Sequence, residues 1–139
     1  MAVLRIMVYS ARMNTDLRDL YVISDLHLGD GGCRDNFELG GRPAQFEAFL
    51  DHVEREKGRL LILGDLFEFW QANIGAVLVR HEALLDRLAR MKARYVVGNH
   101  DVDLLPLIGK RRFLAHPFFR RMSGPFTLTL TVARRRRKL

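Results

Sequence analysis

The sequence predicts an α/β fold in β-α-β-α-β order, with a largely parallel sheet. Three short apolar runs lie at residues 20–24, 60–63 and 95–97. None of them alternates polar and apolar positions, which is typical of strands that are buried on both faces of a sheet. Two longer stretches with helical periodicity separate the runs, and crossovers of this length make consecutive strands parallel.

Both intervening stretches carry an apolar stripe that predicts an amphipathic helix. The first helix is expected to begin near Pro43 and to end at Gly58, because proline suits the first turn and glycine the position after the last. Residues 77–91 predict a second, continuous helix. His81 lies on the stripe of this helix, so we interpret it as a core or rim residue and not as a metal ligand. The stripe of the first helix follows the spacing i, i+3, i+4, i+7: Phe46, Phe49, Leu50 and Val53.

The length of 139 residues, with 48% hydrophobic and 28% charged residues, predicts one domain with its own core. We place this domain at residues 19–132, where 126–132 alternate like a half-exposed strand. Residues 1–18 form either an N-terminal extension or an edge strand. Residues 133–139 form a basic tail, which we expect to be a solvated end and not a nucleic-acid-binding segment.

The chain also lacks the sequence signals of secretion and membrane insertion. The single cysteine, Cys33, excludes an internal disulfide and fits a reducing compartment. No run approaches the 18 apolar residues that a spanning helix needs. We therefore expect a cytoplasmic protein. Cys33 itself is interpreted as a loop residue without a role in metal binding.

Side chains that bind metals follow each of the three apolar runs. Asp25 and His27 follow the first, Asp65 follows the second, and Asn99 opens a polar triplet after the third. Asp25 and His27 should project to the same side if the backbone is extended there. Because the carboxyl ends of parallel strands meet at one edge of a sheet, we expect all four residues to converge on a shared cation pocket.

The three segments resemble the motifs of calcineurin-like metallophosphoesterases. Asp25-Leu26-His27 matches the Asp-x-His block, and residues 64–68 (Gly-Asp-Leu-Phe-Glu) match Gly-Asp-x-x-Asp/Glu. Gly98-Asn99-His100-Asp101 matches Gly-Asn-His-Asp/Glu. The resemblance covers about residues 20–125, the N-terminal half of the family domain. It therefore implies a partial metallophosphoesterase fold, with the second half of the sandwich missing and one sheet face open to a dimer partner or another chain.

The resemblance implies the metal ligands. Asp25 and His27 would hold the first ion, Asp65 would bridge both ions, and Asn99 would bind the second. The ligand types suit Mn²⁺, with iron or Zn²⁺ as alternatives. The family uses further histidines downstream, and no histidine follows His116 in this chain. We therefore expect the second site to be incomplete and the chain to bind at most one ion tightly.

The resemblance also implies two catalytic residues and an activity. His100 would contact the substrate phosphate or protonate the leaving oxygen, and Asp101 would orient the imidazole. The expected function is hydrolysis of phosphoester or pyrophosphate bonds through a dinuclear metal centre. The alternative is a catalytically impaired, truncated fragment that acts only as a metal-binding or interaction module.

The substrate is indicated only as a class. We expect a phosphorylated small molecule or a nucleotide-type compound, and not a nucleic acid. The Leu-Phe-Glu-x-Trp segment at residues 66–70 resembles the bacterial branch that includes UDP-2,3-diacylglucosamine pyrophosphatases, which adds a lipid-linked substrate or peripheral membrane contact to the expectation. That branch often has arginine where this chain has His100. The aromatic residues Phe67, Phe69 and Trp70 either line an apolar cleft or pack the second helix onto the sheet.

Overall fold

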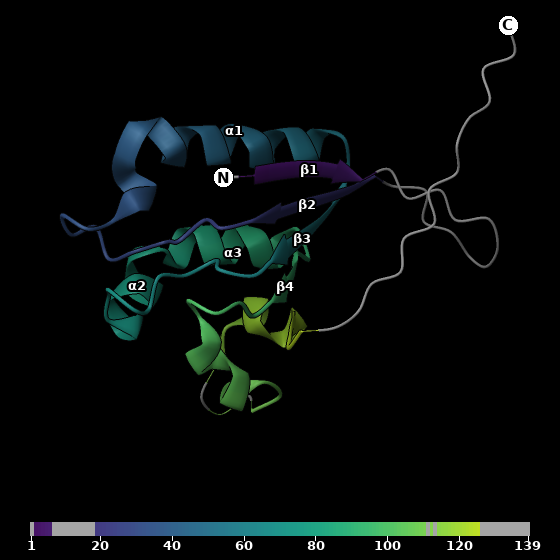
Figure 1. The fold of residues 1–139 in the computed structure, drawn as a ribbon. Helices are drawn as coiled ribbons and strands as arrows, with labels where there is room; N and C mark the ends of the chain where they lie inside the picture. Colours follow the sequence, from purple (N-terminus) through teal and green to yellow (C-terminus); the bar gives the residue numbers. More distant parts are fainter. Residues whose placement is uncertain (1, 7–18, 111, 113, 126–139) are drawn as a thin grey trace, which may run out of the picture.

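The computed structural model of the protein describes residues 2–6, 19–110, 112 and 114–125. They form a five-stranded sheet in the order β1-β2-β3-β4-β5, in which β1 is antiparallel to β2 and the other neighbours are parallel. The segments that follow β2, β3 and β4 all leave the sheet on the same side (Figure 1). The predicted α/β fold with a largely parallel sheet is confirmed.

Five strands, three α-helices and three 3₁₀ helices are found in the described part of the chain. The strands are β1 (Ala2–Ile6), β2 (Leu20–Ser24), β3 (Arg59–Leu63), β4 (Arg94–Val96) and β5 (Met122–Ser123). The α-helices are α1 (Arg42–Arg55), α2 (Ile74–Arg80) and α3 (Glu82–Arg90), and the 3₁₀ helices are η1 (Asn36–Gly41), η2 (Val102–Leu107) and η3 (Pro117–Arg121).

One main core lies between the sheet and the helices. It combines inward-facing residues of β2, β3 and β4 with the apolar stripes of α1 and α3, so both helices cover the same face of the sheet. This is the arrangement that right-handed crossovers between successive parallel strands produce. The aromatic residues of η3 join the same core, with Phe118 fully buried and Phe119 nearly so. The opposite face carries a separate small cluster of Val22, Leu61 and Val96, whereas Leu63 on that face is half exposed.

A single arginine ties the two large helices together. Arg87 of α3 forms ion pairs with three carboxylates of α1, and these carboxylates raise the pKa of its guanidinium further above the ordinary value. The hydrogen bond to Glu54, 2.7 Å long, contributes most to this rise. The three partners are Glu47, Asp51 and Glu54.

The end of α1 differs from the sequence prediction. The helix ends at Arg55, and Lys57 adopts the left-handed conformation (φ 53°) that glycine was expected to provide. Gly58 is required for packing instead, because a Cβ at this position would lie 2.5 Å from Cε2 of Tyr21. The left-handed residue therefore lies one position before the predicted Gly58, whose N–H donates to the carbonyl of Val53 at the end of the helix.

The second helix is also not continuous. Residues 74–90 divide into α2 and α3 at His81, whose backbone leaves the helical conformation (φ −101°, ψ 18°). The apolar stripe nevertheless continues across the break, with Val77 before it and Leu84, Leu85 and Leu88 after it, all buried. A stripe alone cannot reveal such a break, because both halves bury the same side.

Three predictions fall wholly or partly on residues that the structure does not describe: the N-terminal extension or edge strand at 1–18, of which only β1 is described, the strand at 126–132 and the basic tail at 133–139. In the described part of the chain, no helix is long and apolar enough to cross a membrane.

Candidate metal centre

Backbone hydrogen bonds join the three loops that follow β2, β3 and β4. The N–H groups of Leu26 and His27 both donate to the carbonyl of Asp65, each over 3.0 Å. Leu28 and Phe67 then form a parallel bridge, so the first two loops run side by side beyond the sheet. The third loop is joined to the second by the N–H of His100, which donates to Oδ1 of Asp65 over 2.9 Å. Residues far apart in sequence therefore meet in one place.

Three of the predicted ligands have an unusual backbone conformation. Asp25, His27 and Asp65 all lie in the left-handed region, with φ of 58°, 52° and 51°. Residues other than glycine adopt this conformation at a cost of about 1–2 kcal/mol each, and such strain concentrates at functional sites. The side chains of Asp25 and His27 come together because both residues are left-handed. The extended backbone that the sequence analysis assumed is not present at these two residues.

These three side chains form a group that suits a divalent cation. Their ligand atoms, one from each residue, all lie within 4.8 Å of one another. Asp25 is exposed, while His27 and Asp65 are half-buried, so the group opens to solvent. Ser24 donates a hydrogen bond to Oδ2 of Asp25 and helps to fix its carboxylate. Two carboxylates and one imidazole are ligands that Mn²⁺, iron and Zn²⁺ all accept, so the donor set fits the ion that the resemblance implies.

Asn99 lies beside this group. It is exposed and stands between Gly98 and His100, both of which contact Asp65. A Cβ at Gly98 would lie 2.2 Å from Oδ1 and 2.4 Å from the backbone N of Asp65. Only glycine allows the third loop to approach the second so closely.

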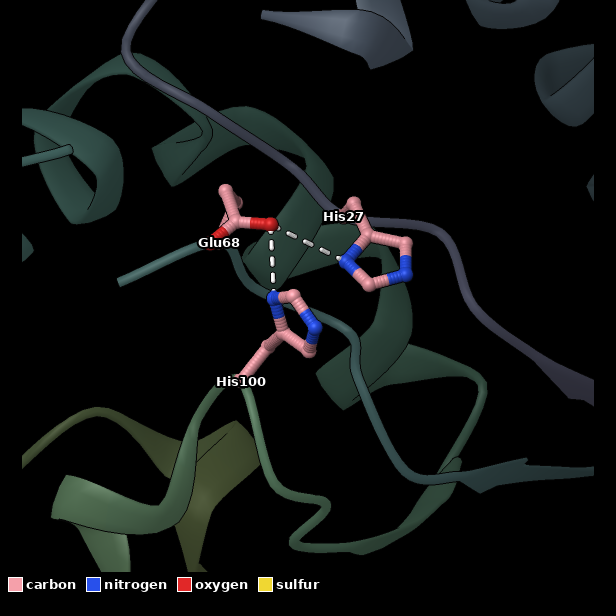
Figure 2. Close-up of side chains that lie close together, drawn as sticks. All are labelled: His27, Glu68 and His100. Atoms are coloured by element: carbon pink, nitrogen blue, oxygen red, sulfur yellow. Dashed lines mark hydrogen bonds and ion pairs between the residues drawn. The ribbon is translucent and has the colours of Figure 1, made fainter. Parts of the chain in front are cut away.

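Glu68 is a site residue to which the sequence analysis gave no role. Its Oε2 lies 2.7 Å from Nδ1 of His100 and 3.2 Å from Nδ1 of His27, and Figure 2 shows both imidazoles turned toward this one oxygen. Its Oε1 accepts a hydrogen bond from the N–H of Trp70. The side chain is buried. The signal was present in the sequence, since Glu68 is the last residue of the second motif.

Asp101 does not contact the imidazole that it was expected to orient. Its Oδ2 accepts hydrogen bonds from the N–H groups of Leu66 (2.8 Å) and Phe67 (3.2 Å), and its Oδ1 accepts one from Gly98 (2.6 Å). The side chain is fully buried, and this burial raises its pKa, against the hydrogen bonds that lower it. Asp101 thus holds the second and third loops together, while Glu68 is the partner of His100.

The aromatic residues after Asp65 divide into two kinds. Phe67 and Phe69 are buried and stacked on each other, with ring centroids 5.2 Å apart, so they pack in the core. Trp70 is 62% exposed and stacks on the ring of His100 at a centroid distance of 3.9 Å. Only Trp70 therefore borders the metal centre.

The remaining histidines near the sheet serve the structure. Nε2 of the buried His81 lies 2.8 Å from the carbonyl oxygen of Gly29, to which it can donate, and so anchors the loop that follows Asp25 and His27. His116 contacts Asp86 over 3.1 Å and accepts a hydrogen bond from the N–H of Phe118 at the start of η3. Neither belongs to the metal-ligand groups found among the described residues.

A hollow of about 270 Å³ adjoins the centre. Glu68 forms part of its wall, so the hollow lies next to the carboxylate that contacts His27 and His100. Cys33 is exposed in the same wall. The other lining residues come from the glycine-rich loop and from the segment before α2: Gly29, Asp30, Gly32, Arg34, Asp35, Gln71 and Ala72.

The chain belongs to the calcineurin-like phosphoesterase family, whose model matches residues 19–133. A UDP-2,3-diacylglucosamine hydrolase of Ralstonia nicotianae is 39% identical over 101 residues, which cover 69% of this chain and 33% of that protein. The matched part of the chain thus spans about a third of the length of this relative. No solved structure matches the chain.

Proposed function

We propose that this chain carries the metal centre of a hydrolase that cleaves phosphoester or pyrophosphate bonds. The observation that supports this most directly is the convergence of Asp25, His27 and Asp65 at the ends of two adjacent parallel strands. The family match supports the same reaction class. When bound, divalent ions would supply Lewis acidity to the phosphoryl group and to the attacking water.

The protein residues have separate tasks in this proposal. Asp25 and His27 would hold the first ion, and Asp65, which has two carboxylate oxygens, would serve both this ion and a second one held by Asn99. His100 donates a proton to the leaving oxygen from Nε2, because its Nδ1 is engaged by Glu68. The carboxylate of Glu68 fixes the orientation of the imidazole. We propose Mn²⁺ as the ion, since the first group offers two carboxylates and a single imidazole.

The substrate is proposed to be a phosphorylated small molecule that carries a nucleotide or lipid group. The Ralstonia relative is named for hydrolysis of UDP-2,3-diacylglucosamine, which has both. The hollow beside Glu68 and the exposed ring of Trp70 provide polar and apolar surface next to the reacting centre.

A second candidate function is metal binding without turnover. It is favoured by the composition of the second ion's ligand set, which includes only Asp65 and Asn99 in this chain, because no histidine follows His116. Two oxygen ligands hold an ion weakly, and a hydrolase of this type depends on charge stabilisation from both ions. In this case the chain would act as a metal-binding or interaction module.

Hydrolysis of an aryl phosphodiester in the presence of Mn²⁺ distinguishes the two candidates. A hydrolase shows metal-dependent release of the aryl group that falls by about 100-fold or more in Asp65→Asn and in His100→Ala. A module without turnover binds Mn²⁺ but releases no aryl group above the level of these variants. Retention of full activity in both variants would contradict the proposed site.

A further inference from the structure

We propose that His27, Glu68 and His100 form a second metal site, selective for Zn²⁺, which competes with the Asp25–His27–Asp65 group for His27. The inference concerns binding and does not depend on catalysis. The ligand atoms of these three residues lie within 4.8 Å of one another, a limit that the first group also meets. The three residues come from the loops after β2, β3 and β4, so all three loops contribute one ligand each.

The geometry of the cluster suits a small tetrahedral ion. Zinc binds imidazole nitrogen and carboxylate oxygen at about 2.0–2.2 Å, which places neighbouring ligand atoms about 3.3 Å apart in a tetrahedral site. Oε2 of Glu68 lies 3.2 Å from Nδ1 of His27, which already fits. Its distance of 2.7 Å from Nδ1 of His100 is that of a hydrogen bond and needs to lengthen by about half an ångström on zinc binding.

The polar atoms of the cluster point to a missing partner. Nδ1 of His27 is buried and makes no hydrogen bond, although Oε2 of Glu68 lies nearby, because the angular geometry is unsuitable. A buried nitrogen without a hydrogen bond is costly, and native structures normally satisfy such atoms. An ion between Nδ1 and Oε2 would satisfy both. Figure 2 shows one nitrogen of each ring, Nδ1, directed at the carboxylate oxygen of Glu68.

The two groups differ in the ions that they prefer. The proposed site offers two imidazoles and one carboxylate, whereas the first group offers one imidazole and two carboxylates. Imidazole favours zinc, while carboxylates favour Mn²⁺ and other hard ions. The buried carboxylate of Glu68 also places the ion in a less polar setting than the exposed carboxylate of Asp25 does. Because His27 belongs to both groups, only one of the two groups can be occupied at a time, by zinc at Glu68 or by manganese at Asp25.

Intrinsic fluorescence provides the readout for zinc. Trp70 is the only tryptophan of the chain, and its indole stacks on His100, so binding of Zn²⁺ to His100 should change its emission. Zinc titration of the parent chain is compared with Glu68→Gln, which keeps the shape of the side chain, and with Asp25→Asn. His116→Gln is the matched control for loss of a histidine outside the site.

We expect the apparent zinc Kd to rise about tenfold or more in Glu68→Gln, and to change less than about threefold in Asp25→Asn and His116→Gln. For Mn²⁺, the apparent Kd should rise more in Asp25→Asn than in Glu68→Gln. Zinc affinity that depends on Asp25 and not on Glu68, or the absence of saturable zinc binding, would overturn the proposal.

Cobalt provides a test that needs no variant. The Co²⁺-substituted parent chain should have the strong visible absorption of a four-coordinate ion. The weak absorption of six-coordinate cobalt would equally contradict the proposed site. Circular dichroism spectra of each variant without metal establish that it folds.

Discussion

Replacement of Asp101 by asparagine should destabilise the fold, because Asp101 clamps two loops from a buried position. Its carboxylate accepts three backbone hydrogen bonds, from Leu66, Phe67 and Gly98. Each such bond to a charged group contributes about 1.5–3 kcal/mol. Asparagine retains acceptor oxygen on one side only and turns an NH₂ group toward the donors on the other. Loss of these hydrogen bonds alone would lower the free energy of unfolding by about 2–4 kcal/mol. Because the variant also removes a buried charge, we expect a net decrease of about 2–3 kcal/mol.

Urea unfolding followed by circular dichroism measures this difference. The experiment is run in EDTA, so that bound metal does not add to the free energy of unfolding. Asp103→Asn is the matched control, because Asp103 is exposed and lies two residues further along the chain, and its effect should stay within about 0.5 kcal/mol. If Asp101→Asn is as stable as this control, the carboxylate does not hold the loops together.

Three further variants test other contacts. Gly98→Ala should weaken Mn²⁺ binding about tenfold or more, because the added Cβ displaces Asp65; titration of the metal measures it, and unchanged affinity would refute the close approach. His81→Phe should destabilise the fold by about 1–2 kcal/mol in urea unfolding, since it leaves the buried carbonyl of Gly29 without its donor; no change would show that the contact is incidental. Arg87→Met should cost about 1 kcal/mol and change the dependence of unfolding on salt, and an equal salt dependence in both proteins would exclude the proposed role of these ion pairs. The partners of Arg87 are Glu47, Asp51 and Glu54.

The fold was predictable because its main strands and helices bury most of their apolar side chains, which leaves a pattern in the sequence. The run at 20–24 was expected as a strand and is β2, since a short apolar run that contains tyrosine, valine and isoleucine is typical of a buried strand. β5 was missed because it has only two residues and pairs through its backbone, which leaves no pattern in the side chains. The break at His81 was missed because the apolar stripe passes through it.

The residues of the metal centre were predictable, but their contacts were not. Asp25, His27 and Asp65 do converge, because parallel strands bring their ends together. The left-handed conformation of these residues has no sequence signal, because it depends on the loops fitting against each other. The resemblance implied that Asp101 orients the imidazole of His100, its neighbour in sequence. Side chains adjacent in sequence often point to different sides, and here Glu68 reaches the imidazole from another loop.

The central claim is that Asp25, His27 and Asp65 together hold a divalent ion. Titration of the chain with Mn²⁺, followed by the electron paramagnetic resonance signal of the free ion, tests this claim most directly. We predict one saturable site per chain, with affinity reduced about tenfold or more in Asp65→Asn. Equal binding by the parent chain and by Asp65→Asn, or no saturable binding by either, would contradict it.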